Sequence, residues 1–99
     1  MDVERFRKKP IVIEAYEYAG RGNGHPRYKG NVPSWVSDGF ESGVLRATNG
    51  TDPLVVVTAE GEMVLSSGDW LIRGVEGELY PCKPSVFAAT YEPVEGEGR

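Results

Sequence analysis

The chain has 99 residues, 39% of them hydrophobic, and a formal net charge of −4 at pH 7. A chain of this length forms a single domain, because it has no material for a second hydrophobic core. The acidic balance disfavours broad nucleic-acid binding, and the single Cys and single His exclude both an intramolecular disulfide and a zinc site built from Cys and His alone.

No apolar run approaches the length that spans a bilayer. The most apolar stretch near the start, residues 10–16, is interrupted by Glu14, so it does not form the apolar segment of a signal peptide. We therefore expect a cytosolic protein that makes no membrane contact and requires neither a cofactor nor a metal.

The charges are unevenly distributed along the chain. Residues 1–49 hold eight Lys and Arg against six Asp and Glu, and residues 50–99 hold three against nine. The basic residues concentrate in "RFRKK", residues 5–9, which could contact phosphate or could act as solvated charge that protects the edge of a neighbouring strand. We adopt the second interpretation, because a cluster of Lys and Arg beside a first strand more often protects the edge of the sheet.

The first predicted strand covers residues 10–18, "PIVIEAYEY", which are rich in β-branched and aromatic side chains. Pro10 suits the first position, where no N–H is needed for the ladder. Alternation gives the strand two faces, one with Ile11, Ile13 and Ala15, the other with Val12, Glu14, Tyr16 and Tyr18.

Residues 19–32 combine four glycines with a proline and basic residues and offer almost nothing to bury, which predicts a long mobile loop. A short helix should follow within residues 33–43, with Ser34 as its N-terminal cap and Gly43 as its end, although Gly39 weakens it. We expect Trp35 of this helix to pack on the sheet.

The rest of the chain returns to a strand pattern. Asn49-Gly50 and Glu60-Gly61 predict turns, and glycine at the second of them supplies the positive φ of a tight hairpin. The predicted strands are residues 44–48, 54–59, 62–67, 69–74 and 78–83. Ser85 should cap a short helix over residues 86–90, and the polar tail, residues 95–99, should fray.

These elements predict an α+β fold made mainly of antiparallel β-sheet, with five to six short strands and one or two short helices. A partial barrel is one arrangement of such strands. The strand order does not follow from the pattern.

Cys82 lies in "YPCKP", residues 80–84, beside a lysine that could stabilise its thiolate. A cysteine nucleophile also needs a positioned base, and nothing in the sequence places the lone His25 near it. The flanking prolines fix two φ angles where a strand passes into a helix. We therefore interpret the segment as a rigid corner and assign no catalytic residue.

Two carboxylates have specific interpretations. Asp69 follows Gly68, a common way to begin a strand from a turn, so we assign it to turn chemistry. Glu14 interrupts an apolar strand and would need a partner if buried, with Arg73 or Lys83 as candidates.

The aromatic residues could form the core or could stack on a planar ligand. We expect Trp35 and Trp70 in the core, whereas Tyr16, Tyr18 and Tyr80 could border a wet site. Arg73 and Lys83 could then bind an anionic group such as a phosphate. The candidate ligand-binding residues are Glu14, Tyr16, Arg73, Tyr80 and Lys83.

The segments "FRKKPIVIEAYEY" and "GDWLIRGVEGELYPCKPSVFAATYEPV" resemble a group of small proteins encoded by tailed bacteriophages and prophages. That group opens with a Lys-Lys-Pro-led strand and ends with a Gly-Asp-Trp, Gly-Glu-x-Tyr-Pro-Cys-Lys-Pro, Phe, Thr-Tyr-Glu pattern. The likeness covers about 40 of the 99 residues at the two ends. It implies phage origin and a location in the cytoplasm of the infected bacterium, and it supplies no biochemical activity.

Because no catalytic constellation is present, the sequence favours a non-enzymatic phage binding module, a homo-oligomer that sequesters a host ligand or inhibits a host defence protein. The ligand would be an anionic planar molecule such as a nucleotide immune signal. One alternative is a structural or accessory protein of the phage particle. Another is a nucleotide-degrading enzyme that uses Glu14, His25 or Cys82.

Overall fold

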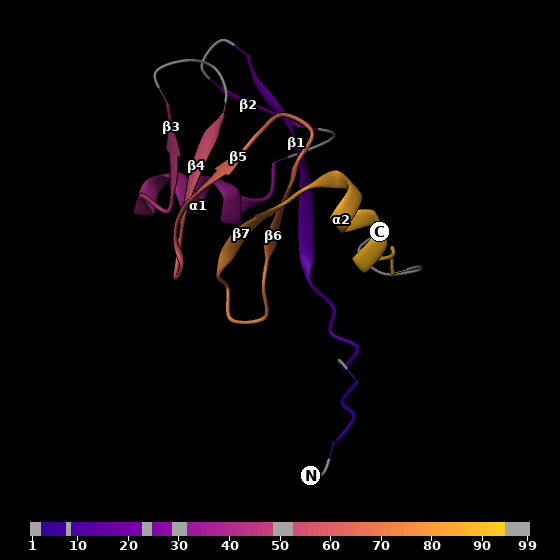
Figure 1. Ribbon diagram of the computed structural model, residues 1–99. Helices are drawn as coiled ribbons and strands as arrows, with labels where there is room; N and C mark the ends of the chain where they lie inside the picture. The colour runs from indigo at the N-terminus through magenta and orange to yellow at the C-terminus, as the bar shows by residue number, and fades with distance from the viewer. Residues whose placement is uncertain (1–2, 8, 23–24, 29–31, 49–52, 95–99) are drawn as a thin grey trace.

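The computed structural model describes residues 3–7, 9–22, 25–28, 32–48 and 53–94 of the chain (Figure 1). The elements are β1 (Glu14–Gly22), β2 (His25–Tyr28), α1 (Ser34–Ser42), β3 (Leu45–Ala47), β4 (Leu54–Thr58), β5 (Gly61–Leu65), β6 (Trp70–Arg73), β7 (Leu79–Cys82) and α2 (Pro84–Thr90). Most strands follow one another directly along the chain, with one helix after β2 and one after β7, as expected for an α+β fold. The predicted α+β class is confirmed, with seven strands in the described residues instead of five to six.

The strands form two antiparallel sheets. One has four strands in the order β2-β1-β6-β7, and the other has three in the order β3-β4-β5. β7, at the edge of the larger sheet, lies close to β4 and β5 of the smaller one. No strand pairing joins the two sheets in the described part of the chain, so they do not close into a barrel.

The first strand differs from the prediction at both ends. It begins at Glu14 instead of Pro10, because its neighbour β6 ends at Arg73, directly opposite Glu14. It continues to Gly22 because β2 pairs with its far end, after an irregularity between Tyr18 and Arg21. Part of the segment that we predicted as a loop, residues 19–32, is therefore a β-hairpin.

Some predicted features fall outside the described residues. They are residues 23–24 and 29–31 of the predicted loop, the Asn49-Gly50 turn and the frayed tail at residues 95–99.

The two sheets and α1 share one hydrophobic core. The buried residues are Tyr16, Tyr18, Val36, Leu45, Leu54, Val56, Leu65, Leu71 and Leu79, with Trp35 and Phe40 packed against them. Tyr16 lies opposite Leu71 across the β1–β6 pair, as alternation in β1 requires. The expected packing of Trp35 on the sheet is confirmed.

The N-cap of each helix differs from the predicted residue, whereas the C-terminal end of α1 is as predicted. α1 ends at Gly43, whose φ of 87° is the left-handed conformation that favours glycine, as predicted. Its N-cap is Pro33 instead of Ser34, and no side chain caps it. The N-cap of α2 is Lys83 instead of Ser85, because Pro84 occupies the first helical position, where its missing N–H costs nothing.

The β4–β5 hairpin confirms the role predicted for Gly61. Its φ is 111°, and it pairs with Thr58 across a turn formed by Ala59 and Glu60. The Thr58 hydroxyl accepts a hydrogen bond from the Glu60 N–H at 3.1 Å, which holds the turn closed.

Gly39 is required where α1 meets the core. A Cβ at this position would lie 2.9 Å from Leu45 Cδ1 and 3.1 Å from Leu79 Cδ1, closer than packed side chains tolerate. The same glycine weakens the helix by about 1 kcal/mol relative to alanine. Close packing of α1 on the two sheets therefore explains a residue that helix propensity alone disfavours.

Replacing Gly39 with Ala should destabilise the protein despite the better helix propensity. Overpacking a closed core costs about 1–3 kcal/mol, so we expect the free energy of unfolding in urea to fall by about 1 kcal/mol. Ser37→Ala, at an exposed position of the same helix, is the matched control and should change it by less than about 0.5 kcal/mol. A more stable Gly39→Ala protein would contradict the described packing.

Candidate functional site

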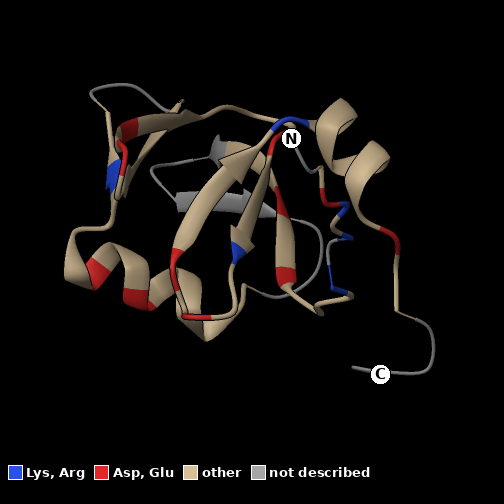
Figure 2. Ribbon diagram, turned by 60° about the horizontal axis from the view of Figure 1, so that its bottom comes forward, with Lys and Arg blue, Asp and Glu red and all other residues tan. Residues whose placement is uncertain are grey.

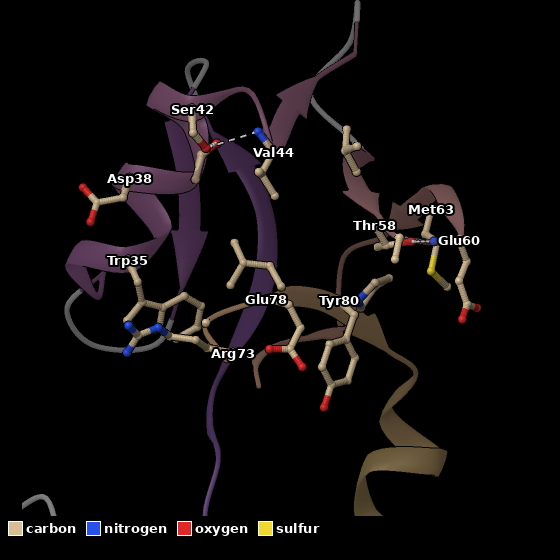
Figure 3. Close-up of a pocket in the computed structure, with 16 residues that line it drawn as sticks. Trp35, Asp38, Ser42, Val44, Thr58, Glu60, Met63, Arg73, Glu78 and Tyr80 are labelled. Carbon is tan, nitrogen blue, oxygen red and sulfur yellow. Dashed lines mark hydrogen bonds between the residues drawn. The ribbon is translucent and has the colours of Figure 1, made fainter. Parts of the chain in front are cut away.

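A groove of about 730 Å³ lies between α1, the β4–β5 hairpin and the β6–β7 hairpin (Figure 3). Its volume falls in the range of small-molecule pockets. Apolar side chains form much of its lining: Trp35, Val44, Val57, Met63, Leu79 and Pro81. The groove exists because β7 approaches β4 and β5 without pairing with them, which leaves space along the edge of the larger sheet.

The charged side chains of the groove are mostly acidic. Asp38 comes from α1, Glu60 from the turn between β4 and β5, and Glu78 from the residue before β7. Figure 3 shows the three at separate points around the groove. Arg73 is the one cationic residue among the described residues of the lining, and its guanidinium donates to the Glu14 carboxylate at 2.8 Å.

Glu78 is fixed by the turn that precedes β7. Its Oε1 accepts a hydrogen bond from the Glu76 N–H at 3.0 Å, and its carboxylate occupies the space where a side chain on Gly74 would lie. The Gly74 N–H donates to the Glu78 carbonyl at 2.8 Å, which closes the turn. The groove therefore has, at the β6–β7 end, one carboxylate that a hydrogen bond within its own turn positions.

Sequence reasoning did not identify Asp38, Glu60 or Glu78 as site residues. Each lies in or beside a turn or on an exposed helix face, where acidic residues are common and carry no signal of function. They come together only through the approach of β7 to the smaller sheet, which the sequence pattern did not predict. The uneven charge of the chain was the one available hint.

Of the two candidate partners for Glu14, the structure pairs it with Arg73, and the two residues are exposed instead of buried. Their side chains remain 62% and 43% accessible. An exposed pair of this kind contributes little to stability, about 1 kcal/mol at most. Its effect on the groove is electrostatic, since it neutralises the cation that the prediction assigned to an anionic ligand.

Arg73 and Tyr80 both border the groove, yet their side chains do not converge. Arg73 lies opposite Leu79 in the β6–β7 register, and Tyr80 lies opposite Ile72, so the two side chains project from opposite faces of the sheet. Tyr80 hydrogen-bonds Tyr91 beyond α2, and burial followed by this hydrogen bond raises the pKa of Tyr80.

Tyr16 lies behind the groove instead of in it. Its side chain is 7% exposed, and its ring meets Trp35 edge to face with centroids 6.0 Å apart. Burial raises the pKa of Tyr16 to about 12. Its hydroxyl has no hydrogen-bond partner among the described residues, so Tyr16 supports the wall that Trp35 forms and is not presented to a ligand.

Lys83 is separated from the groove residues by its contact with Asp69. Its Nζ donates to Asp69 Oδ2 at 3.0 Å. The same oxygen accepts a hydrogen bond from the Ser66 N–H at 2.9 Å, in the turn that leads into β6. Asp69 is 3% exposed, so the predicted turn role is confirmed and extended by an ion pair.

The surroundings of Cys82 support a structural role for "YPCKP". Its thiol donates weakly to the Lys83 carbonyl at 3.7 Å, and the Lys83 ammonium is directed to Asp69. Burial, followed by the negative charge of Asp69, raises the pKa of the Cys82 thiol. A raised pKa lowers the thiolate population that a cysteine nucleophile needs.

Aromatic rings complete this region. Trp70 stacks on Phe87 of α2 with ring centroids 4.1 Å apart and planes 5° apart, and Phe87 meets Tyr91 at 5.1 Å. We call the set of Asp69, Trp70, Cys82, Lys83 and Phe87 the corner. It contains five of the fourteen residues that define the C-terminal pattern described in the sequence analysis.

Within the described ranges, no group of three His, Cys, Asp or Glu side chains is placed to hold a metal ion. Neither described helix has the length and apolar character that crossing a membrane requires. The side chain of His25 lies outside the described part of the structure, so the prediction that it is not placed beside Cys82 stays a prediction.

Comparison of the chain with protein-family models, curated proteins and solved structures gives no significant match.

Replacing Tyr16 with Phe should be neutral or stabilising by up to about 1 kcal/mol, because a buried hydroxyl without a partner is costly. Tyr16 should also contribute to alkaline unfolding. Because the pKa of Tyr16 is higher in the folded than in the unfolded state, its hydroxyl ionises at a lower pH when the protein is unfolded. The free energy of unfolding therefore falls as the pH rises from about 10 toward about 12. The Phe variant should lose less stability over that range in urea titrations. A clear loss of stability at pH 7 would instead mean that the hydroxyl makes a contact the fold needs.

Proposed function

We propose that this protein is a non-enzymatic binding module whose groove holds an extended, apolar segment that carries positive charge, supplied by a partner protein. The observation that carries the proposal is the composition of the groove. Among the residues that the structure describes, apolar side chains line it, three carboxylates surround it, and its one guanidinium is paired with Glu14.

The apolar lining supplies the contact area and the carboxylates supply the selectivity. Trp35 and Met63 are residue types that are enriched where proteins bind each other. Carboxylates at separate points around a groove attract a basic segment and repel an acidic one, which favours one class of partner over another.

An anionic planar ligand such as a nucleotide fits this groove less well. The two cations that the sequence offered for phosphate are both engaged, Arg73 with Glu14 and Lys83 with Asp69. Tyr80 projects from the face opposite to Arg73. A nucleotide in the groove would meet Asp38, Glu60 and Glu78 without a free cation from the described lining.

The biological setting of the proposal comes from the sequence resemblance alone. If the chain is a phage protein acting in the bacterial cytoplasm, the partner segment belongs to a host protein, and binding it would sequester or inhibit that protein. A small module without a catalytic centre acts by occupancy, so its effect would depend on its concentration relative to its target.

Trp35 provides the signal that tests the proposal. In a Trp70→Phe background it is the one remaining tryptophan, and phenylalanine preserves an aromatic ring against Phe87. We expect its fluorescence to respond to a short peptide of alternating Arg and Ile, and not to a matched peptide of Glu and Ile or to cyclic and linear nucleotides.

Groove variants make the test specific. Glu60→Gln and Glu78→Gln should each weaken binding of the basic peptide by about two- to fivefold, the effect of removing one exposed charge. Glu41→Gln, on α1 outside the groove lining, should leave it unchanged. Equal binding of the acidic peptide, preferential binding of a nucleotide, or no binding of any probe would contradict the proposal.

A further inference from the structure

The segment before β1 has exposed apolar side chains, and none of the described strands pairs with it. We call residues 3–13 the arm. Figure 1 shows its described residues, 3–7 and 9–13, leading away from the body of the molecule below β1. Val3 and Phe6 are 86% and 87% exposed, and Val12 is 65% exposed. Side chains of this type are expected to be buried when a partner surface is present.

The sequence of the arm is that of a strand without a neighbour. Residues 10–13, "PIVI", have the β-branched composition from which we predicted the start of β1. The strand nevertheless begins at Glu14, since β6 offers no residue beyond Arg73. The N–H and C=O groups of the preceding residues are therefore available to a second polypeptide.

The charge of the arm complements the groove. Its described charged residues are Arg5, Arg7, Lys9 and Glu4, so cations outnumber carboxylates. Figure 2 shows basic residues along the N-terminal segment, and acidic residues on α1 and in the turn between β6 and β7. The arm therefore combines basic and apolar residues, as does the segment that we propose the groove binds.

We propose that the arm of one copy of this protein occupies the groove of a second copy, so that the chain assembles as a homodimer by reciprocal exchange of arms. This inference rests on the proposed function, because it names the occupant of the same groove. It also implies that a partner segment must compete with the arm.

The position of the arm favours exchange over docking on its own copy. Its base, Glu14, is paired with Arg73 at the groove lining, and from there the arm leads outward. To enter the groove of its own copy it would have to reverse direction at Ile13, at the end of a run of β-branched residues, 11–13, which favour extended backbone over tight turns. Fully extended, its eleven residues reach about 36–40 Å, enough to cross a body whose shorter dimensions are 35 and 24 Å.

A charge-swap experiment tests the exchange. One variant carries Arg5→Glu with Arg7→Glu in the arm, and another carries Asp38→Lys with Glu60→Lys in the groove. In either variant alone, arm and groove have the same charge. In a mixture, each arm again meets a groove of the opposite charge.

Sedimentation velocity over a range of concentrations gives the readout. We expect a dimer for the unaltered chain, a dimer dissociation constant raised about tenfold or more in each variant, and recovery of a heterodimer when the two are mixed. Glu41→Lys with Glu62→Lys is the matched control for the groove variant and should dimerise like the unaltered chain. Thermal unfolding of the variant monomers shows whether they are folded.

Three outcomes would overturn the inference. The first is a monomer at all concentrations for the unaltered chain. The second is a dimer that neither set of charges affects, which would place the interface elsewhere. The third is two folded variants that remain monomeric when mixed.

The arm variant also separates this inference from the proposed function, since its groove is intact. If it binds the basic peptide while the unaltered chain is monomeric, the groove is a binding site and the second copy is not its occupant. If the arm variant binds no peptide, both proposals fail.

Discussion

The carboxylate of Asp69 is the buried charge around which the C-terminal half of this structure is arranged. It is the one charged side chain of the described residues that is buried, and burying a charge is costly unless it is paired and hydrogen-bonded. Asp69 satisfies that requirement with the Ser66 N–H on one side and the Lys83 ammonium on the other. The turn before β6 and the start of α2 are thereby held together.

The backbone of the same turn connects the corner to the first strand. The Tyr18 N–H donates to the Asp69 carbonyl at 2.9 Å, and the Gly68 N–H donates to the Tyr18 carbonyl at 2.7 Å. The corner therefore helps to set where β1 lies against β6. Because β6 and its turn present Arg73 and Glu78 to the groove, the geometry of the groove depends on an interaction at the other end of the strand.

These contacts give a physical reason for the two most specific pieces of the sequence. In "GDW", Gly68 has a φ of 94°, Asp69 forms the ion pair and Trp70 stacks on Phe87. In "YPCKP", Lys83 completes the ion pair and Pro84 begins α2. A cysteine beside a lysine in such a segment can suggest a reactive centre. In this structure the side chains of the two segments instead make contacts that stabilise the fold.

Local rules predicted those parts of the structure that depend on neighbouring residues in the chain. Gly43 and Gly61 adopt the positive φ angles that a helix end and a tight hairpin require, and Asp69 lies in a turn. β2 was missed because a segment rich in glycine offers few side chains to form a strand pattern, and its pairing with β1 supplies the order. Capping by Ser34 and Ser85 was wrong because a proline lies next to each serine and shifts the helix boundary.

The candidate site was predicted less well because it depends on contacts between distant segments. A carboxylate in an apolar strand suggested a nearby cation for Glu14, and of the two candidates Arg73 is its partner. Lys83 was an equal candidate as the partner of Glu14, and only the three-dimensional structure shows that it pairs with Asp69. The carboxylates of the groove belong to three different elements, so their proximity follows from strand order, which alternation does not determine.

The measurement that tests this account most directly is a double-mutant cycle between Asp69 and Lys83. It compares the free energies of unfolding in urea for Asp69→Asn, Lys83→Met and the double variant. We expect Asp69→Asn to cost about 1–3 kcal/mol, as loss of a charged hydrogen bond at a buried site does. The two substitutions should be coupled by about 0.5–1 kcal/mol, since Lys83 is largely exposed. Additive effects within about 0.3 kcal/mol, or an Asp69→Asn protein as stable as the unaltered chain, would contradict the role of the corner.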